Sequence, residues 1–127
     1  MNVFKMIKGM LTSAPRVTPQ ECAPKIIAGT AILVDVREPD EWSKGVAQDA
    51  VLLALSDLAG PREKWAAFLA EAGDREIFLY CGAGVRSGMA ARMLASEGFR
   101  AANSGSLSSW TGAGWPLVHP GANSDRG

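Results

Sequence analysis

The sequence predicts an α/β domain built on a mostly parallel β-sheet. Segments with the pattern of buried strands alternate along the chain with segments whose apolar residues recur at helical spacing. The stretch 31–37 is almost continuously apolar, as expected for a parallel strand that is covered on both faces. The chain has 127 residues, a length that fits one domain and leaves no room for two.

The first regular element is expected to be a helix that begins after Thr18. Thr18 can cap the helix, Pro19 suits its first position, and Glu21 can reach back to complete a capping box. Gly29 stands where the end of this helix belongs. The helical spacing places Cys22 on the apolar face, so we expect Cys22 to point into the core.

The rest of the chain continues the alternation of strands and helices. Strands are expected at residues 31–37, 51–55, 76–80 and 100–103. A helical turn is expected at 40–42, and Pro61 is expected to open a helix that closes at Gly73. The last long helix follows the segment 81–87 and ends at Gly98, with an apolar stripe made of Met89, Ala90, Met93 and Leu94. Ser106 is expected to cap a final short helix.

The two ends of the chain are expected to lie outside this alternation. We interpret residues 1–16 as an N-terminal arm or short helix, residues 17–118 as the domain and residues 119–127 as a flexible tail. Lys8 and Gly9 interrupt the apolar residues near the start, so this segment does not have the pattern of a signal peptide. We therefore expect a cytoplasmic protein.

Composition excludes several functional classes. The 13 basic residues balance the 13 acidic ones, which gives no electrostatic signature of nucleic-acid binding. No apolar run approaches the length needed to cross a bilayer, so we expect no stable membrane insertion. The two cysteines and the one histidine do not have metal-ligand spacing. We expect neither a metal nor a cofactor.

The segment with chemical content runs from Cys81 to Ser87. It joins the carboxyl end of a predicted strand to the start of a predicted helix, which is the edge where open α/β sheets bind ligands. Gly82 and Gly84 allow the backbone to curl, so that successive N–H groups can converge on one point. These donors and the helix N-terminus should lower the pKa of Cys81, and Arg86 can add positive charge for an anionic substrate.

The chain resembles the rhodanese-like family. The match to the N-terminal signature of that family runs from Leu33 to Trp42, and the match to its active-site loop runs from Tyr80 to Ser87. Gly98-Phe99 resembles the end of the helix that follows, and Trp110, Gly114 and Pro116 resemble the closing motif. The resemblance covers about residues 17–118 and implies an open parallel sheet flanked by helices on both faces.

The resemblance implies a sulfurtransferase, an enzyme similar to thiosulfate sulfurtransferase. Cys81 would be the nucleophile, and a donor such as thiosulfate would leave a sulfane sulfur on it as a persulfide. The loop formed by Gly82, Ala83, Gly84, Val85, Arg86 and Ser87 would hold the transferred sulfur. The partners would be a small anionic sulfur donor and a thiophilic acceptor, cyanide or a thiol, or a protein of a sulfur relay. Gly82 stands where many relatives have a polar or charged residue, and the loss of those side-chain contacts predicts poor turnover of thiosulfate.

Asp35 and Arg37 are candidate supporting residues at the end of the predicted strand 31–37. An ion pair or loop anchor is the favoured interpretation of both, ahead of a part in the chemistry. Glu38 and Glu41 are expected to be solvated or turn-forming.

Two other functions fit the same loop. Cysteine-dependent phosphatases and arsenate reductases also place a cysteine before an anion-binding loop and an arginine. Their loop has one residue more than the four that separate Cys81 from Arg86 here. A persulfide carrier or interaction module without turnover is the second alternative.

Overall fold

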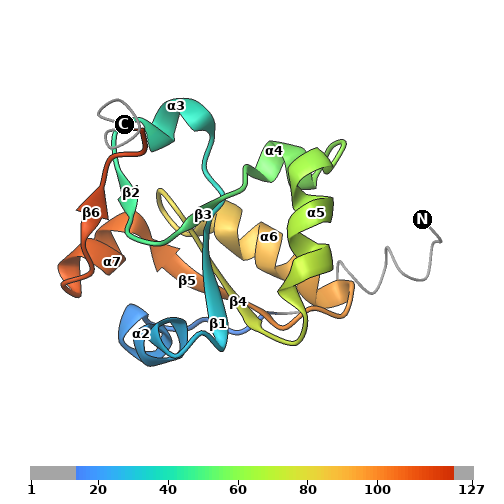
Figure 1. Ribbon diagram of the computed structural model, residues 1–127, viewed down its shortest axis with the longest axis horizontal. Helices are drawn as coiled ribbons and strands as arrows, with labels where there is room; N and C mark the ends of the chain where they lie inside the picture. Colours follow the sequence, from blue (N-terminus) through green and yellow to red (C-terminus); the bar gives the residue numbers. More distant parts are fainter. Residues whose placement is uncertain (1–13, 122–127) are drawn as a thin grey trace.

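The four-stranded sheet is the centre of the domain (Figure 1). The computed structural model describes residues 14–121. The sheet has the order β3-β1-β4-β5 and all of its neighbouring strands run parallel. Its strands are β1 (Ala31–Asp35), β3 (Val51–Leu52), β4 (Glu76–Cys81) and β5 (Ala101–Ser106). A second sheet, which was not expected, pairs β2 (Val46–Ala47) with β6 (Leu117–Val118) in antiparallel fashion.

Helices cover both faces of the main sheet, as the sequence predicted. They are α2 (Pro19–Ile27), α3 (Pro39–Trp42), α4 (Leu55–Leu58), α5 (Glu63–Ala72), α6 (Val85–Ser96) and α7 (Leu107–Gly112). One buried cluster joins the sheet to side chains of α4, α5 and α6, and another joins it to side chains of α2 and α7. The open, parallel α/β architecture is therefore confirmed.

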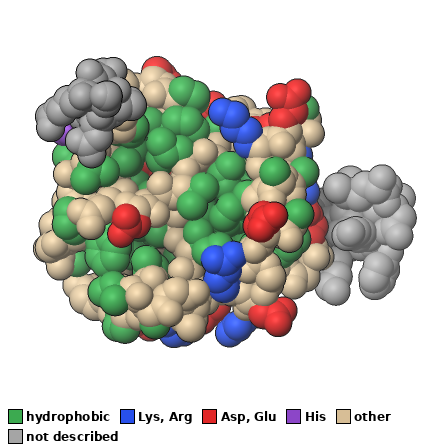
Figure 2. Space-filling view, viewed as in Figure 1, with side chains coloured by type: hydrophobic (Ala, Val, Ile, Leu, Met, Phe, Trp, Pro, Cys, Tyr) green, Lys and Arg blue, Asp and Glu red, His purple; other side chains and the backbone are tan. Residues whose placement is uncertain are grey.

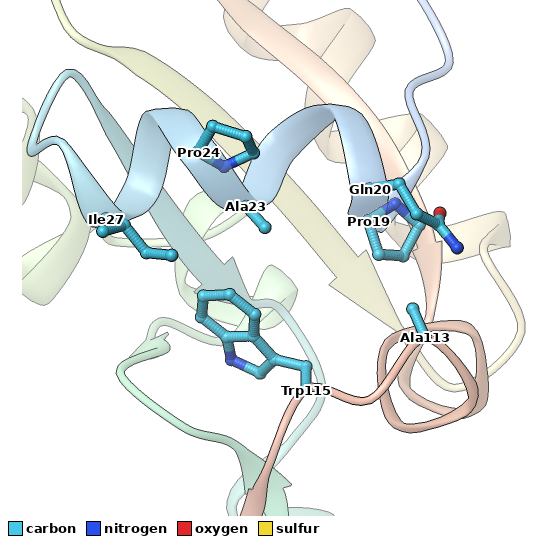
Figure 3. A pocket seen from close by; sticks show the side chains of 7 residues that line it. All are labelled: Pro19, Gln20, Ala23, Pro24, Ile27, Ala113 and Trp115. Atoms are coloured by element: carbon cyan, nitrogen blue, oxygen red, sulfur yellow. The ribbon is translucent and has the colours of Figure 1, made fainter.

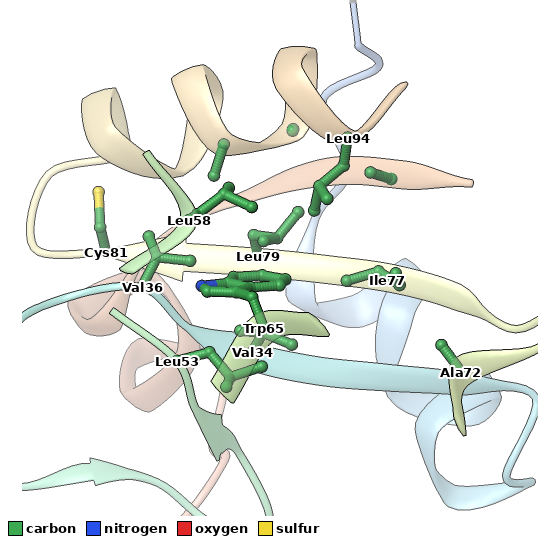
Figure 4. Close-up of a cluster of buried hydrophobic side chains, with 13 residues drawn as sticks. Val34, Val36, Leu53, Leu58, Trp65, Ala72, Ile77, Leu79, Cys81 and Leu94 are labelled. Carbon is green, nitrogen blue, oxygen red and sulfur yellow. The ribbon is translucent and has the colours of Figure 1, made fainter. Parts of the chain in front are cut away.

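Side chains of β4 alternate between these two clusters. Ile77, Leu79 and Cys81 face α5 and α6, as Figure 4 shows, whereas Phe78 and Tyr80 face the side of α2 and α7. All five are buried, which explains why this strand reads as a continuous apolar run. The alternation also determines that the Cys81 side chain lies on the face covered by α6.

The expected start of the first helix is confirmed. The Thr18 hydroxyl accepts the Glu21 N–H at 3.2 Å, and the Glu21 carboxylate accepts the Thr18 N–H at 3.0 Å. These reciprocal bonds satisfy two backbone donors that the first turn would otherwise leave unpaired. Cys22 is completely buried in the α2 side of the core, also as expected.

The strand expected at 51–55 is present but covers only Val51–Leu52, and the expected helix start at Pro61 was wrong. Only residues 51–52 pair with β1, and residues 55–58 form the short helix α4 instead. Helix α5 begins at Glu63, because the carboxylate of Asp57 accepts the N–H groups of Glu63, Lys64 and Trp65 at 2.9 to 3.1 Å. A side chain on the preceding helix thus caps α5 from a distance that local patterns do not show.

The expected apolar stripe of α6 is confirmed for Ala90, Met93 and Leu94, which are buried or pack against the core, but not for Met89. Met89 is 46% exposed, whereas Ala90, Ala91 and Leu94 are buried. Small residues on the buried side let this helix lie close to β4 and β5, so the larger methionine faces outward. The strand expected at 100–103 is β5, which starts at Ala101 and continues to Ser106.

The surface has no strong segregation of charge on the face shown in Figure 2, where basic and acidic side chains lie interspersed with apolar ones. Among the described residues, no helix combines the length and apolar character that crossing a membrane requires. Residues 1–13 of the expected N-terminal arm lie outside the described residues. So does the part of the expected tail that follows Gly121.

Candidate active site

Cys81 is the last residue of β4, and α6 begins four residues later at Val85. We call residues 81–87 the Cys81 loop. Gly84 is its turning point, with a φ of +90° in the left-handed region that side chains with a Cβ rarely adopt. Gly82 does not have a positive φ, so the expected curl of the backbone depends on Gly84 and not on both glycines.

Hydrogen-bond donors of this loop converge on the Cys81 sulfur. The N–H of Gly84 lies 3.0 Å from Sγ, and the N–H and hydroxyl of Ser87 each lie 3.4 Å from it. Burial raises the pKa of Cys81, but the donors of Ser87, Ala83 and Gly84 favour the thiolate more strongly, so the net effect is a lowered pKa. The arrangement stabilises negative charge on a sulfur atom.

Cys81 is buried, although it stands at the end of a strand and the start of a loop. The residue is only 1% exposed, because the loop closes over the side chain at the end of the α5–α6 cluster. Figure 4 shows its sulfur turned away from the apolar side chains, toward the loop and the start of α6. The thiol is therefore buried at residue level while its sulfur faces the amide donors.

Asn103 is a site residue that the sequence did not reveal. Its Oδ1 accepts the Ser87 hydroxyl at 2.7 Å and the Gly105 N–H at 3.0 Å, and its Nδ2 donates to the Gly84 carbonyl at 3.0 Å. Asn103 is paired in register with Leu79 on the neighbouring strand, and β5 gains one residue relative to β4 only after it, between Asn103 and Ser106. The sequence of β5 also contains Ser104 and Ser106, so its composition did not single out Asn103.

Arg86 was expected to offer its positive charge to a substrate, but its guanidinium is already paired within the protein. It forms a double ion pair with Glu41, with Nη1–Oε1 at 2.6 Å and Nη2–Oε2 at 2.9 Å. The hydrogen bonds from Arg86 lower the pKa of Glu41 to about 2, and those to Glu41 raise the pKa of Arg86. Glu41 is turn-forming, as expected, since it completes a capping box with Glu38, but its ion pair with Arg86 was not expected.

Asp35 and Arg37 form the ion pair that was the favoured interpretation. Arg37 Nη2 lies 2.9 Å from Asp35 Oδ2 and donates to the Gly45 carbonyl at 2.6 Å, and the Trp42 indole donates to Asp35 Oδ1 at 3.1 Å. Arg37 is buried, which lowers its pKa, but the bonds to Asp35 raise it more. Neither residue bonds to the Cys81 loop, so the pair anchors the segment that carries Glu41.

A groove of about 440 Å³ lies between α2 and the residues that follow α7 (Figure 3). It is lined by Pro19, Gln20, Ala23, Pro24, Ile27, Ala113 and Trp115. None of these side chains is nucleophilic or titratable, and none belongs to the Cys81 loop. Within residues 14–121, no three His, Cys, Asp or Glu side chains lie close enough together to hold a metal ion.

Solved structures with the same fold include several rhodanese-like proteins. A rhodanese-related protein from Thermoplasma volcanium is 27% identical, with 82% of this chain and 97% of that chain covered and a TM-score of 0.67. The E. coli "rhodanese with anions" is 26% identical, with 70% and 98% covered and a TM-score of 0.58.

A protein of unknown function from Rhodopseudomonas palustris, described as a possible tyrosine phosphatase, is 24% identical, with 83% and 85% covered and a TM-score of 0.68. At this identity the likeness shows the fold alone. None of the curated proteins matches the chain. The sequence matches the family "Rhodanese-like domain" over residues 18–113, which include β4, the Cys81 loop and α6. The chain belongs to the rhodanese-like domain family.

Proposed function

We propose that this protein is a sulfurtransferase in which Cys81 carries a sulfane sulfur as a persulfide. The observation that carries the proposal is the convergence of three donors on the Cys81 sulfur, two N–H groups and one hydroxyl. Donors in this arrangement favour the thiolate, which is the nucleophilic form of cysteine. The same groups are placed to hold the negative charge of a persulfide at the base of the loop.

The reaction follows a double-displacement scheme. The Cys81 thiolate attacks the outer sulfur of a donor, and the bond between that sulfur and the rest of the donor breaks with its electron pair on the leaving group. With thiosulfate the leaving group is sulfite, and the protein keeps the outer sulfur as Cys81–S–S⁻. A thiophilic acceptor then attacks the terminal sulfur, so that cyanide leaves as thiocyanate and the Cys81 thiolate is restored.

The N–H and hydroxyl groups of the Cys81 loop stabilise negative charge both before and during sulfur transfer. Because they are fixed by α6 and by Asn103, they need no rearrangement when charge moves between donor, persulfide and acceptor. Arg86 has its guanidinium committed to Glu41 and acts in this scheme by holding α3 against the loop.

The test is formation of thiocyanate from cyanide and a sulfane-sulfur donor, with thiosulfate and inorganic polysulfide offered separately. Wild-type protein should form thiocyanate with at least one of them, and Cys81→Ser should form none. Cys22→Ala is the matched control, because Cys22 is buried and burial raises the pKa of Cys22 to about 12. Hydrolysis of an aryl phosphate that Cys81→Ser abolishes, without any thiocyanate, would overturn the proposal in favour of a phosphatase.

A further inference from the structure

Among the described donors at the Cys81 sulfur, the Ser87 hydroxyl is the one that can turn. The N–H groups of Gly84 and Ser87 have their direction set by the backbone, whereas a hydroxyl proton rotates about its C–O bond. The Ser87 oxygen lies 2.7 Å from Asn103 Oδ1 and 3.4 Å from both the sulfur and the Gly105 carbonyl oxygen. Its single proton therefore bonds to one of these acceptors at a time.

Two backbone groups determine which way the Asn103 amide faces. The Gly84 carbonyl can only accept, so it faces Asn103 Nδ2 at 3.0 Å. The Gly105 N–H can only donate, so it faces Asn103 Oδ1 at 3.0 Å. Oδ1 is therefore the atom beside Ser87. Because an amide oxygen has no proton to give, the bond between the two side chains requires the Ser87 hydroxyl to donate.

The amide of Asn103 lies in a space that helix α6 leaves open for it. Asn103 is only 7% exposed. A Cβ built on Gly88 of α6 would stand 3.2 Å from Asn103 Nδ2 and 3.5 Å from Arg92 Nη1, and the first distance is shorter than ordinary van der Waals contact. A glycine inside a helix weakens the helix relative to alanine, so Gly88 gives up helix stability for the position of this amide.

We propose that Asn103 is a positioning residue that accepts the Ser87 proton while the Cys81 sulfur is neutral and yields it to the sulfur when the sulfur becomes charged. A thiolate is the stronger acceptor, because its charge strengthens the hydrogen bond. A neutral sulfur is a weak acceptor, so the amide oxygen is then preferred. The exchange turns one proton, and Asn103 Oδ1 keeps the Gly105 N–H throughout.

This competition sets the sign of the effect that Asn103 has on the thiolate. Burial raises the pKa of Cys81, and the Ser87 hydroxyl makes the largest of the opposing contributions. Turning that hydroxyl to the sulfur costs its bond to Asn103, so Asn103 holds the pKa of Cys81 above the value that the same loop would give without it. A side chain that only braced the loop would have the opposite effect, because its loss would loosen the donors around the sulfur.

The part that Asn103 plays in sulfur transfer rests on the proposed function. In the second half of that reaction cyanide attacks the terminal sulfur, the S–S bond breaks, and its electron pair returns to the Cys81 sulfur. The Ser87 proton then turns from Asn103 to this new charge. The proton changes its hydrogen-bond partner but stays on the Ser87 oxygen, so one negative charge leaves with thiocyanate and one remains on Cys81.

The charged side chains on the elements around the sulfur stay the same in the variants that test this role. Arg86 of α6 is paired with Glu41 of α3, and Arg37 is paired with Asp35 at the end of β1. Asp57 of α4 accepts three N–H groups of α5. Strand β5 has no charged residue. A change in the titration of the sulfur therefore reports on the Ser87 proton.

The test replaces Asn103 with a side chain of similar size that accepts no proton. The background is Cys22→Ala, which leaves Cys81 as the single thiol. Asn103→Leu should lower the midpoint of the pH dependence of Cys81 alkylation by roughly half a pH unit to one, because a neutral hydrogen bond contributes about three- to tenfold to an equilibrium.

Ser104→Ala is the matched control for a polar side chain lost from β5. The Ser104 hydroxyl is also buried, but it bonds to the Leu79 carbonyl and the Trp110 indole and not to Ser87. The alkylation midpoint of Ser104→Ala should therefore equal that of the Cys22→Ala parent.

Removal of the Ser87 hydroxyl separates the competition from a change in loop packing. In the presence of Ser87→Ala, Asn103→Leu should no longer lower the midpoint, because no proton is left to compete for. If Asn103→Leu does not fold, Asn103→Asp takes its place in the comparison. Asn103→Asp should raise the midpoint more with Ser87 present than with Ser87→Ala, and equal rises would contradict the competition.

A second readout follows the persulfide itself. After the protein is loaded and the donor is removed, Asn103→Leu should form thiocyanate from cyanide about two- to threefold faster than the parent, because a thiolate of lower pKa leaves more readily. An unchanged rate would overturn the part of Asn103 in transfer.

A midpoint that rises or stays in place in Asn103→Leu, or an equal fall in Ser104→Ala, would overturn the role of Asn103 and leave the sulfurtransferase proposal standing. The expected midpoints without persulfide from any donor would overturn the sulfurtransferase proposal and leave the assignment of the Ser87 proton standing.

Discussion

The hydroxyl of Ser87 lies 2.7 Å from Asn103 Oδ1 and 3.4 Å from both the Cys81 sulfur and the Gly105 carbonyl oxygen, so these three acceptors compete for its single proton. Asn103 Oδ1 also accepts the Gly105 N–H at 3.0 Å. It therefore retains a hydrogen bond when the Ser87 proton turns to the sulfur. Ser87 and Asn103 thus connect Cys81 by hydrogen bonds to β5, where Asn103 lies sixteen residues after Ser87.

Asn103→Asp should raise the pKa of Cys81. The new carboxylate brings a second negative charge close to the sulfur and competes more strongly for the Ser87 proton. The measurement is the pH dependence of Cys81 alkylation in a Cys22→Ala background, whose midpoint should move to higher pH. A midpoint unchanged from that of the parent protein would mean that Asn103 only braces the loop.

Ser87→Ala should also raise the pKa of Cys81, because it removes the hydroxyl that contributes most among the loop donors to the thiolate. The alkylation midpoint should lie closer to 9.0, the ordinary value for a cysteine. Ser96→Ala is the matched control, since its hydroxyl bonds to the Met93 carbonyl within α6 and not to the site. Equal midpoints in the two variants would contradict the role of the Ser87 hydroxyl.

Gly84→Ala should destabilise the protein through backbone strain. A Cβ at Gly84 would lie 3.7 Å from Gly105 Cα, which is ordinary contact, so the cost arises from its φ of +90° and not from a clash. The left-handed conformation costs a residue with a Cβ about 1–2 kcal/mol. Urea denaturation should show a loss of unfolding free energy of this size. Gly112→Ala is the comparison, because it has open space and no positive φ.

Asp57→Ala should lower the unfolding free energy by about 1–2 kcal/mol, as loss of a helix cap does. Three N–H groups at the start of α5 lose their acceptor in this variant. Asp57→Asn keeps one carbonyl oxygen and should lose less. Thermal denaturation of both variants tests the order, and equal stability of Asp57→Ala and wild type would show that water replaces the carboxylate without cost.

The ion pair of Glu41 and Arg86 should give a pH-dependent contribution to stability. The pKa of Glu41 is about 2 in the folded protein, against an ordinary value of 4.5. Because the folded value is depressed, the contribution is fully present above about pH 4.5 and is lost as the pH falls toward 2. Melting temperatures of wild type and Glu41→Gln should therefore differ at neutral pH and converge in acid. A constant difference across this range would contradict the assignment.

Sequence patterns predicted those parts of the site that neighbouring residues determine. The succession of β4, Cys81 and α6 follows from a buried strand, a glycine-containing turn and a helix start that adjoin in the chain. The partners of the loop could not be predicted in this way. Glu41 is 45 residues from Arg86, and Asn103 lies on the neighbouring strand β5, 16 residues from Ser87. Tertiary packing brings these side chains together, and no local period encodes it.

Intact-mass measurement after exposure to a sulfane-sulfur donor tests the central proposal most directly. In the Cys22→Ala background, the protein should gain the mass of one sulfur atom per chain and lose it again on addition of cyanide. The same protein with Cys81→Ser should gain nothing. A gain that persists in Cys81→Ser, or no gain from any donor in the parent protein, would contradict the assignment of Cys81 as the sulfur carrier.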